Sequence, residues 1–180
     1  MYHRVIDNFV DFNLLNDFQK NYVDTGLLNV AFTNNGDDSL NLGTHGFTSS
    51  LPESLPDTDK IYPPLINYLY EKINPIAKKH QLEIYRWHYN LAPSSFDGTV
   101  HKDYLDKPRL TFIFCSSPEW QLSWGGELLL YDLNYEAKTA ISYVPNRLII
   151  INGFYPHRGL GPYRLINKIR TTIAFQTKDL

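Results

Sequence analysis

Two histidines, one aspartate and one arginine in the second half of the chain have types and spacing suited to metal-dependent oxidation. His101 and Asp103 are separated by one residue, His157 follows Asp103 by 54 positions, and Arg170 follows His157 by 13. Two imidazoles and one carboxylate can occupy one face of an octahedral Fe(II) ion and leave the opposite face open for other ligands. An arginine offers a planar, permanently charged fork for the distant carboxylate of a bound acid. The set therefore predicts an iron oxygenase with a dicarboxylate cosubstrate.

The local pattern around the triplet fits ligands that come from strands. Residues two apart on a strand point to the same side, so His101 and Asp103 can face one metal while Lys102 faces away. The third ligand must come from elsewhere, and Pro156-His157 follows an apolar segment and a turn at Asn152-Gly153. We therefore predict a metal site made of His101, Asp103 and His157, although an isolated histidine is more often a surface or hydrogen-bonded residue than a ligand.

The chain has four other histidines, and their surroundings make them weaker candidates for ligands: His3, His45, His80 and His88. His80 ends the basic run Lys78-Lys79-His80, where cations complement the dipole of a helix end. His88 is expected on a strand, without a carboxylate two residues away. His3 is expected to be frayed, and His45, in a glycine-containing loop, could approach a substrate.

Arg170 begins a segment whose alternation predicts a strand with one unusual face. One face would carry Arg170, Thr172 and Ala174, and the other Thr171, Ile173 and Phe175. Apart from the arginine, the side chains of the first face are small, which suits a barrel interior with room for a ligand. Burying an arginine without a partner is unfavourable, so a bound acid would justify its position. The alternative is a surface arginine on an edge strand.

Further motifs surround these residues in order: Tyr89-Asn90, Arg109-Leu110-Thr111-Phe112-Ile113, Trp124-Gly125-Gly126-Glu127-Leu128, Val144-Pro145, Pro156-His157 and Arg170-Thr171-Thr172. Over about residues 82–176 the series resembles the Fe(II)/2-oxoglutarate-dependent dioxygenases, and within them the prolyl-hydroxylase-like branch. A weaker resemblance to the same family lies at Ile6-Asp7-Asn8-Phe9-Val10.

The resemblance implies a site, a set of cofactors and a reaction. His157 would be the distal metal ligand, Arg170 with Thr172 would hold the remote carboxylate of 2-oxoglutarate, and the hydroxyl of Tyr89 would reach its metal-binding end. The implied cofactors are Fe(II), 2-oxoglutarate and O₂, with ascorbate as an additional reductant. The implied reaction hydroxylates an unactivated C–H bond, of a prolyl or other amino-acid residue or of a small molecule, and releases succinate and CO₂. The carboxylate of Asp103 favours hydroxylation over halogenation, and demethylation by hydroxylation stays open.

One position departs from the family pattern. Prolyl-hydroxylase-like members often place a tyrosine where this chain has Cys115, and the tyrosine hydroxyl helps to bind the remote carboxylate. A thiol is a poor substitute as a hydrogen-bond donor. We expect Thr111 or Thr172 to compensate, and Cys115 to line the pocket.

Periodicity predicts a mainly β (α+β) fold. Helices are expected at Asp11–Asp24 and from Pro63 or Pro64 to His80, with Pro75 bending or interrupting the second. Strands are expected near Leu82–Asn90, Arg109–Cys115, Glu127–Asp132, Ala140–Tyr143, Arg147–Ile151 and Ile169–Gln176. Helices followed by strands fit an antiparallel jelly roll with N-terminal supporting helices, and the resemblance implies the double-stranded β-helix. We expect a single domain over residues 1–180, with helical support over about 1–81 and a catalytic core over about 82–176.

Composition points to a cytoplasmic enzyme. The formal net charge is −2, so nothing calls for nucleic acid as a bulk electrostatic partner. The single cysteine, Cys115, excludes an intrachain disulfide and fits a reducing compartment. The N-terminal residues lack the apolar core of a signal peptide, and the aliphatic run Leu148–Ile151 is too short to cross a membrane.

Two other classes of function are compatible with the sequence. One is a jelly-roll binding module with a structural metal site, and the other is a cupin-like metal enzyme that does not use 2-oxoglutarate and commonly has additional histidine ligands. No sequence motif identifies the primary substrate. The polar, glycine-containing loop from Asn34 to Asp59 is predicted to close over it.

Overall fold

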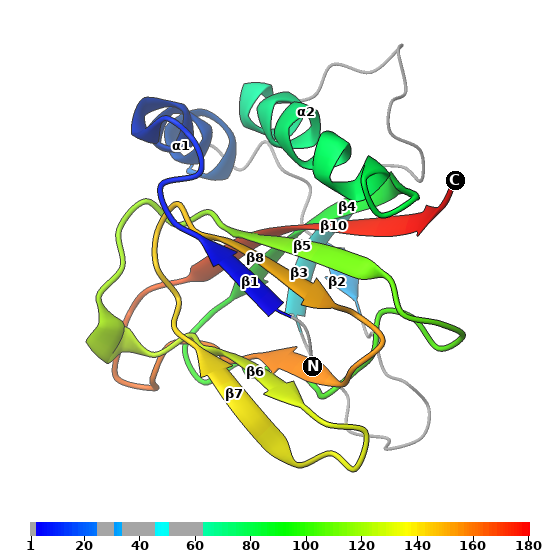
Figure 1. The fold of residues 1–180 in the computed structure, drawn as a ribbon. Coiled ribbons are helices and arrows are strands. Elements are labelled where there is room, and N and C mark those ends of the chain that lie inside the picture. The colour runs from blue at the N-terminus through cyan, green and yellow to red at the C-terminus, as the bar shows by residue number, and fades with distance from the viewer. Residues whose placement is uncertain (1–2, 25–30, 34–45, 51–62) are drawn as a thin grey trace.

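The computed structural model describes residues 3–24, 31–33, 46–50 and 63–180, and it is built on two antiparallel sheets (Figure 1). The large sheet has the order β1-β8-β5-β10-β4-β3-β2 and the small sheet the order β7-β6-β9. The large sheet comprises β1 (His3–Ile6), β8 (Leu148–Asn152), β5 (Leu110–Cys115), β10 (Arg170–Asp179), β4 (Leu82–Ala92), β3 (Gly46–Ser50) and β2 (Ala31–Thr33). The small sheet comprises β7 (Ala137–Ile141), β6 (Leu128–Tyr131) and β9 (His157–Gly159). The predicted mainly β architecture is confirmed.

Two helices lie on the face of the large sheet that is turned away from the small sheet (Figure 1). The first, α1 (Phe12–Phe18), starts at Asp11, whose carboxylate accepts a hydrogen bond from the Asn13 amide at 2.8 Å, and continues as a π-helix over Gln19–Val23. The second, α2 (Pro64–Lys78), has Pro64 in its first turn, where a missing N–H costs nothing. Both helices were predicted.

Pro75 does not interrupt α2, contrary to one of the two outcomes expected for it. The helix runs through Pro75 to Lys78, and Lys79 donates its amide to the carbonyl of Pro75 at 3.3 Å. Pro75 lies close to the C-terminal end, so the proline removes one hydrogen bond without breaking the helix. No helix in the described residues is long and apolar enough to span a membrane.

Alternation along the strands divides the buried side chains into two layers. On β10, Ile173 and Phe175 belong to the cluster packed against the helices, whereas Ala174 belongs to the cluster between the two sheets. The helix-side cluster includes Leu65, Leu69, Ile73, Trp87, Tyr89, Phe112 and Phe114. The inner cluster comprises Ile113, Cys115, Leu128, Leu130, Ile141, Tyr143, Ile149, Ile151 and Ala174. The inner layer is the barrel interior, and its polar positions form the candidate site.

Short strands account for most differences from the sequence expectations. His3, expected to be frayed, pairs with Ile151 as the first residue of β1, and β9 was not predicted. β3 falls in the segment predicted as loop, and β7 begins three residues earlier than predicted, at Ala137. Such strands show little periodicity of their own, and pairing with distant strands defines them. The remainder of the loop from Asn34 to Asp59, including His45, lies outside the described residues.

Candidate metal centre and cosubstrate pocket

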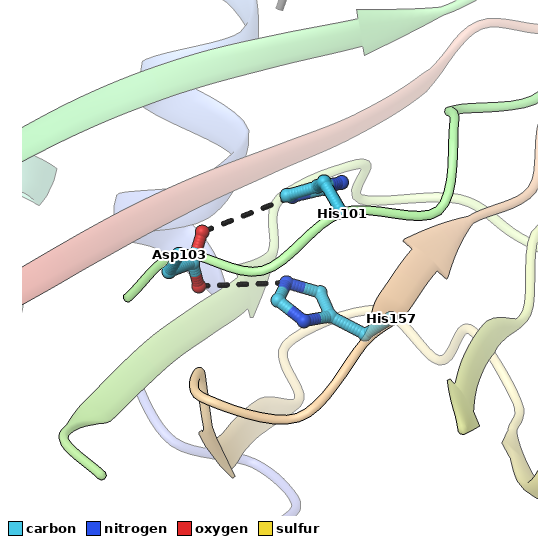
Figure 2. A group of neighbouring side chains, drawn as sticks. All are labelled: His101, Asp103 and His157. Atoms are coloured by element: carbon cyan, nitrogen blue, oxygen red, sulfur yellow. Dashed lines mark ion pairs between the residues drawn. The ribbon is translucent and has the colours of Figure 1, made fainter. Parts of the chain in front are cut away.

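The predicted triplet converges on one point. One potential ligand atom from each of His101, Asp103 and His157 lies within 4.8 Å of the other two. The Nε2 atom of His101 is 3.8 Å from one carboxylate oxygen of Asp103, and Nε2 of His157 is 3.4 Å from the other (Figure 2). His101 and His157 face each other across an antiparallel bridge, with reciprocal backbone hydrogen bonds of 3.0 and 2.9 Å. Thus residues distant in the sequence are joined by backbone pairing at the site itself.

Both imidazoles are oriented by backbone carbonyls. The Nδ1 atom of His101 lies 3.0 Å from the carbonyl oxygen of Thr99, and Nδ1 of His157 lies 3.0 Å from that of Tyr155. A carbonyl can only accept, so each Nδ1 carries the proton and each Nε2 keeps its lone pair. This is the arrangement in which histidine binds a metal through Nε2.

Both oxygens of the Asp103 carboxylate accept a hydrogen bond from a neutral side chain. The Thr111 hydroxyl donates to Oδ2 at 2.6 Å, and the Gln176 amide donates to Oδ1 at 3.0 Å. Tyr85 donates to the amide oxygen of Gln176 at 3.4 Å, which directs the amide nitrogen toward Asp103. A Cβ at Gly153 would lie 2.8 Å from Oδ2, so only glycine leaves room for the carboxylate there.

Electrostatics favour a charged carboxylate between two imidazoles. Burial disfavours the charged form of Asp103, but His157, His101 and the Thr111 hydroxyl outweigh it and hold the pKa of Asp103 well below its usual range. Burial also opposes protonation of His157, yet the neighbouring Asp103 raises its pKa, whereas burial and His157 lower the pKa of His101. One carboxylate and two imidazole nitrogens form the donor set of non-haem Fe(II) sites, so the residues fit this metal.

Arg170 is buried, with 5% of its surface exposed, and its guanidinium is held on three sides. Its Nε donates to the carbonyl of Gly126 at 2.8 Å, and its Cζ lies 5.1 Å from the centre of the Tyr143 ring. Gly126 has φ +86°, and a Cβ there would approach the Arg170 side chain to 3.1 Å. A Cβ at Gly159 would lie 3.1 Å from Nη1. The two glycines therefore shape the slot for this side chain.

No carboxylate in the described part of the chain forms an ion pair with Arg170. A buried guanidinium is stable only with compensating partners, and Gly126 satisfies a single N–H. The guanidinium reaches β9 at Gly159, two residues beyond His157, which is about 6.6 Å along a strand. The cation and the histidine thus share one side of β9 at a spacing on the scale of a short dicarboxylate.

The remaining predicted residues of the pocket are distributed differently. Thr172 is buried on the inner face, is paired with Cys115 and receives a hydrogen bond of 3.5 Å from Asn90. Thr111 contacts Asp103, so its observed partner is the ligand carboxylate. Cys115 lines the interior, and burial raises the pKa of its thiol to about 11.

Tyr89 is not in the pocket, and this corrects the sequence expectation. It pairs with Ile173, points to the helix side and meets the ring of Phe18 with centroids 5.8 Å apart. Side chains alternate along a strand, so the interior positions of β4 belong to its neighbours His88 and Asn90.

Three contributors were missed by sequence reasoning: Gln176, Tyr143 and His88. The same alternation that selects Arg170, Thr172 and Ala174 continues to Gln176, and this signal was available. Tyr143 and His88 carried no such signal, because Tyr143 lies two residues beyond the end of β7 and the facing of β4, which holds His88, was not known. His88 stays outside the group of potential ligand atoms formed by the described residues.

Comparisons with known proteins agree on the fold. No protein-family model matches the sequence, and no curated protein matches it in sequence. Three solved structures are similar. One is a prolyl hydroxylase from Trichoplax adhaerens in complex with a hypoxia-inducible-factor peptide (16% identity, TM-score 0.75, 98% of this chain and 83% of that chain). Another is a prolyl-4-hydroxylase from Pseudomonas putida (16%, 0.64, 99% and 92%). The third is a viral collagen prolyl hydroxylase from Paramecium Bursaria Chlorella virus-1 in complex with 2-oxoglutarate (13%, 0.63, 100% and 97%). The chain has the double-stranded β-helix fold of these prolyl hydroxylases.

Proposed function

We propose that this protein is an Fe(II)- and 2-oxoglutarate-dependent oxygenase. It would hydroxylate an unactivated C–H bond, so that the substrate, 2-oxoglutarate and O₂ yield the hydroxylated product, succinate and CO₂. The observation that carries the proposal is the combination of a two-histidine, one-carboxylate cluster with a buried Arg170 that has no carboxylate partner among the described residues. The likeness in fold to prolyl hydroxylases supports it.

Each residue of the pocket has a separate task in this proposal. His101, Asp103 and His157 would hold Fe(II), which supplies the O₂ chemistry when bound. Arg170 would bind the remote carboxylate of the cosubstrate through its free Nη groups, because Nε is already committed to Gly126. The apolar side chains of the inner cluster would exclude water from the reacting groups.

Two other classes of function explain these observations less well. Neither alternative explains why Arg170 is buried. A cupin-like metal enzyme that does not use 2-oxoglutarate would not need its charge, and a jelly-roll binding module with a structural metal site would not need it either. Both would require a buried guanidinium to be retained against its desolvation cost. The primary substrate would be a prolyl or other residue of a peptide or a small molecule, and demethylation by the same chemistry is compatible with the site. Ascorbate would serve as reductant, and we propose a cytoplasmic location, since lone Cys115 suits a reducing compartment.

The test is an anaerobic titration of the Fe(II) protein with 2-oxoglutarate, followed through the visible charge-transfer band of the chelate. Losing a charge-assisted contact of roughly 1.5–3 kcal/mol should weaken binding by at least about tenfold in Arg170→Ala. Arg170→Lys keeps the charge but loses the fork, so its affinity should lie between those of Arg170→Ala and the unmodified protein. Iron binding should survive both changes.

The matched control is Arg164→Ala, because Arg164 is exposed. It should titrate like the unmodified protein. Absence of a band in the unmodified protein, or an unchanged titration in Arg170→Ala, would refute the cosubstrate pocket.

A further inference from the structure

Beside Tyr85, whose hydroxyl contacts Gln176, the inner face of β4 carries the polar residues Arg86, His88 and Asn90. They pair in register with Gln176, Ala174 and Thr172 of β10. Directly paired residues of an antiparallel sheet point to the same face, and the side chain of Gln176 reaches Asp103 in the barrel interior. This row of β4 therefore borders the metal cluster and has no role in holding the metal or Arg170.

His88 is the next residue of this row after Arg86, and it lies outside the ligand set of the described residues. Its imidazole is close enough to Asp103 and His101 to feel both electrostatically, and burial, followed by the charge of Arg86, lowers its pKa to about 4. Its Nδ1 atom is shielded from solvent and has no hydrogen-bond partner. Buried polar atoms in native proteins are nearly always satisfied, so an unpartnered one beside a reaction centre points to a ligand.

The balance of charge indicates what kind of ligand this is. Within the described pocket, the negative charge of Asp103 balances the positive charge of Arg170. The two positive charges of Fe(II) would balance the two negative charges of 2-oxoglutarate. Arg86 then remains, and no carboxylate of the described residues forms an ion pair with it. An anionic group on the primary substrate would neutralise this excess positive charge.

We propose that the inner face of β4 recognises the primary substrate through a carboxylate, with Arg86 supplying the charge and His88 a hydrogen bond. The proposal rests on the proposed function and names the substrate class for that same site. The carboxylate belongs either to a free amino acid or to an acidic side chain next to the target residue of a peptide. Both sources present the same oxygen atoms, and matched amides distinguish carboxylate recognition from recognition of the remaining groups.

The experiment measures succinate release above the rate with 2-oxoglutarate alone. The probes are free L-amino acids with their α-amides, and prolyl peptides that place Asp or Asn beside the proline. The acids should stimulate more than their matched amides, with kcat/KM at least about tenfold higher. Stimulation by free acids identifies an amino-acid substrate, and stimulation by Asp peptides identifies a peptide substrate.

Variants assign the recognition to its residues. Arg86→Gln should reduce the acid-to-amide ratio to less than about threefold, whereas Arg86→Lys should keep most of it. His88→Leu should raise KM for the acid and leave the chelate band with 2-oxoglutarate unchanged, and His88→Gln should restore part of the affinity. Exposed residues of the same types provide controls, Arg164→Gln and His80→Leu, which should behave as the unmodified protein.

The chelate band and succinate release distinguish a failure of the proposed function from a failure of carboxylate recognition. If the unmodified protein shows neither a chelate band nor succinate release, the proposed function itself is wrong. If it shows both, the substrate proposal is overturned by any of three results: amides stimulate as well as acids, no acid stimulates, or both Arg86→Gln and His88→Leu keep the full acid preference. A weakened chelate band in His88→Leu also overturns it, because His88 would then belong to the cosubstrate.

Discussion

The hydrogen bond from Thr111 to Asp103 allows a quantitative test of how the metal site is built. Its 2.6 Å length and the buried carboxylate make it a charge-assisted bond, and the second oxygen is held separately by Gln176. Thr111→Val keeps the shape of the side chain and removes only the donor. The carboxylate would then be free to rotate about the remaining bond from Gln176.

A hydrogen bond to a charged group contributes roughly 1.5–3 kcal/mol, which corresponds to about 10- to 150-fold in an equilibrium constant. Loss of an outer contact to a metal ligand typically weakens metal binding by about 10- to 100-fold, which lies within this range. We therefore expect Thr111→Val to weaken Co(II) binding by about 10- to 100-fold. The assay is a competition titration with a chelator, followed by the d–d absorption of Co(II), which also reports the coordination geometry.

Controls separate the lost donor from a general loss of structure. Thr111→Ser keeps the hydroxyl and should retain most of the affinity, and Gln176→Leu should weaken binding through the other oxygen. Thr139→Val, on β7 at the edge of the small sheet, should have no effect. Co(II) affinity within about threefold of the unmodified protein in both Thr111→Val and Gln176→Leu, with an unchanged spectrum, would refute the reasoning.

His157→Ala should abolish Mn(II) binding by electron paramagnetic resonance as well as turnover, and full metal content with full activity would exclude His157 as a ligand. Because Asp103 raises the pKa of His157, the metal must displace a proton there once the pH falls through that raised pKa, so metal affinity should drop with falling pH by up to about tenfold per pH unit for each proton; a flat titration profile would argue against this competition. Gly159→Ala places a Cβ 3.1 Å from Nη1 of Arg170 and should weaken 2-oxoglutarate binding while metal affinity stays constant; equal weakening of both would indicate a wider disturbance. Leu69→Ala removes a fully buried side chain of α2 and should lower the free energy of unfolding by about 2–5 kcal/mol in urea titration, and a loss below about 1 kcal/mol would contradict tight packing there.

The sequence alone determined the parts of this protein that depend on local spacing. The three- and four-residue spacing of apolar side chains predicted both helices, and the short apolar runs located β4, β5, β6, β8 and β10 to within a few residues. The His101-x-Asp103 pattern and the alternation that begins at Arg170 selected side chains that lie in the barrel interior. These features are readable because the period of a helix or strand decides which neighbours share a face.

The tertiary structure decided which face of each strand turns inward and which distant residues meet. A shift of one position moved the pocket side of β4 from Tyr89 to His88 and Asn90, and nothing in the segment itself revealed it. The contact between Gln176 and Asp103 joins positions 73 residues apart, and the ring of Tyr143 lies against Arg170 from the segment that follows β7. Such contacts depend on the register of paired strands, and register is set by the packing of the whole sheet against its two cores, so a local pattern does not contain it.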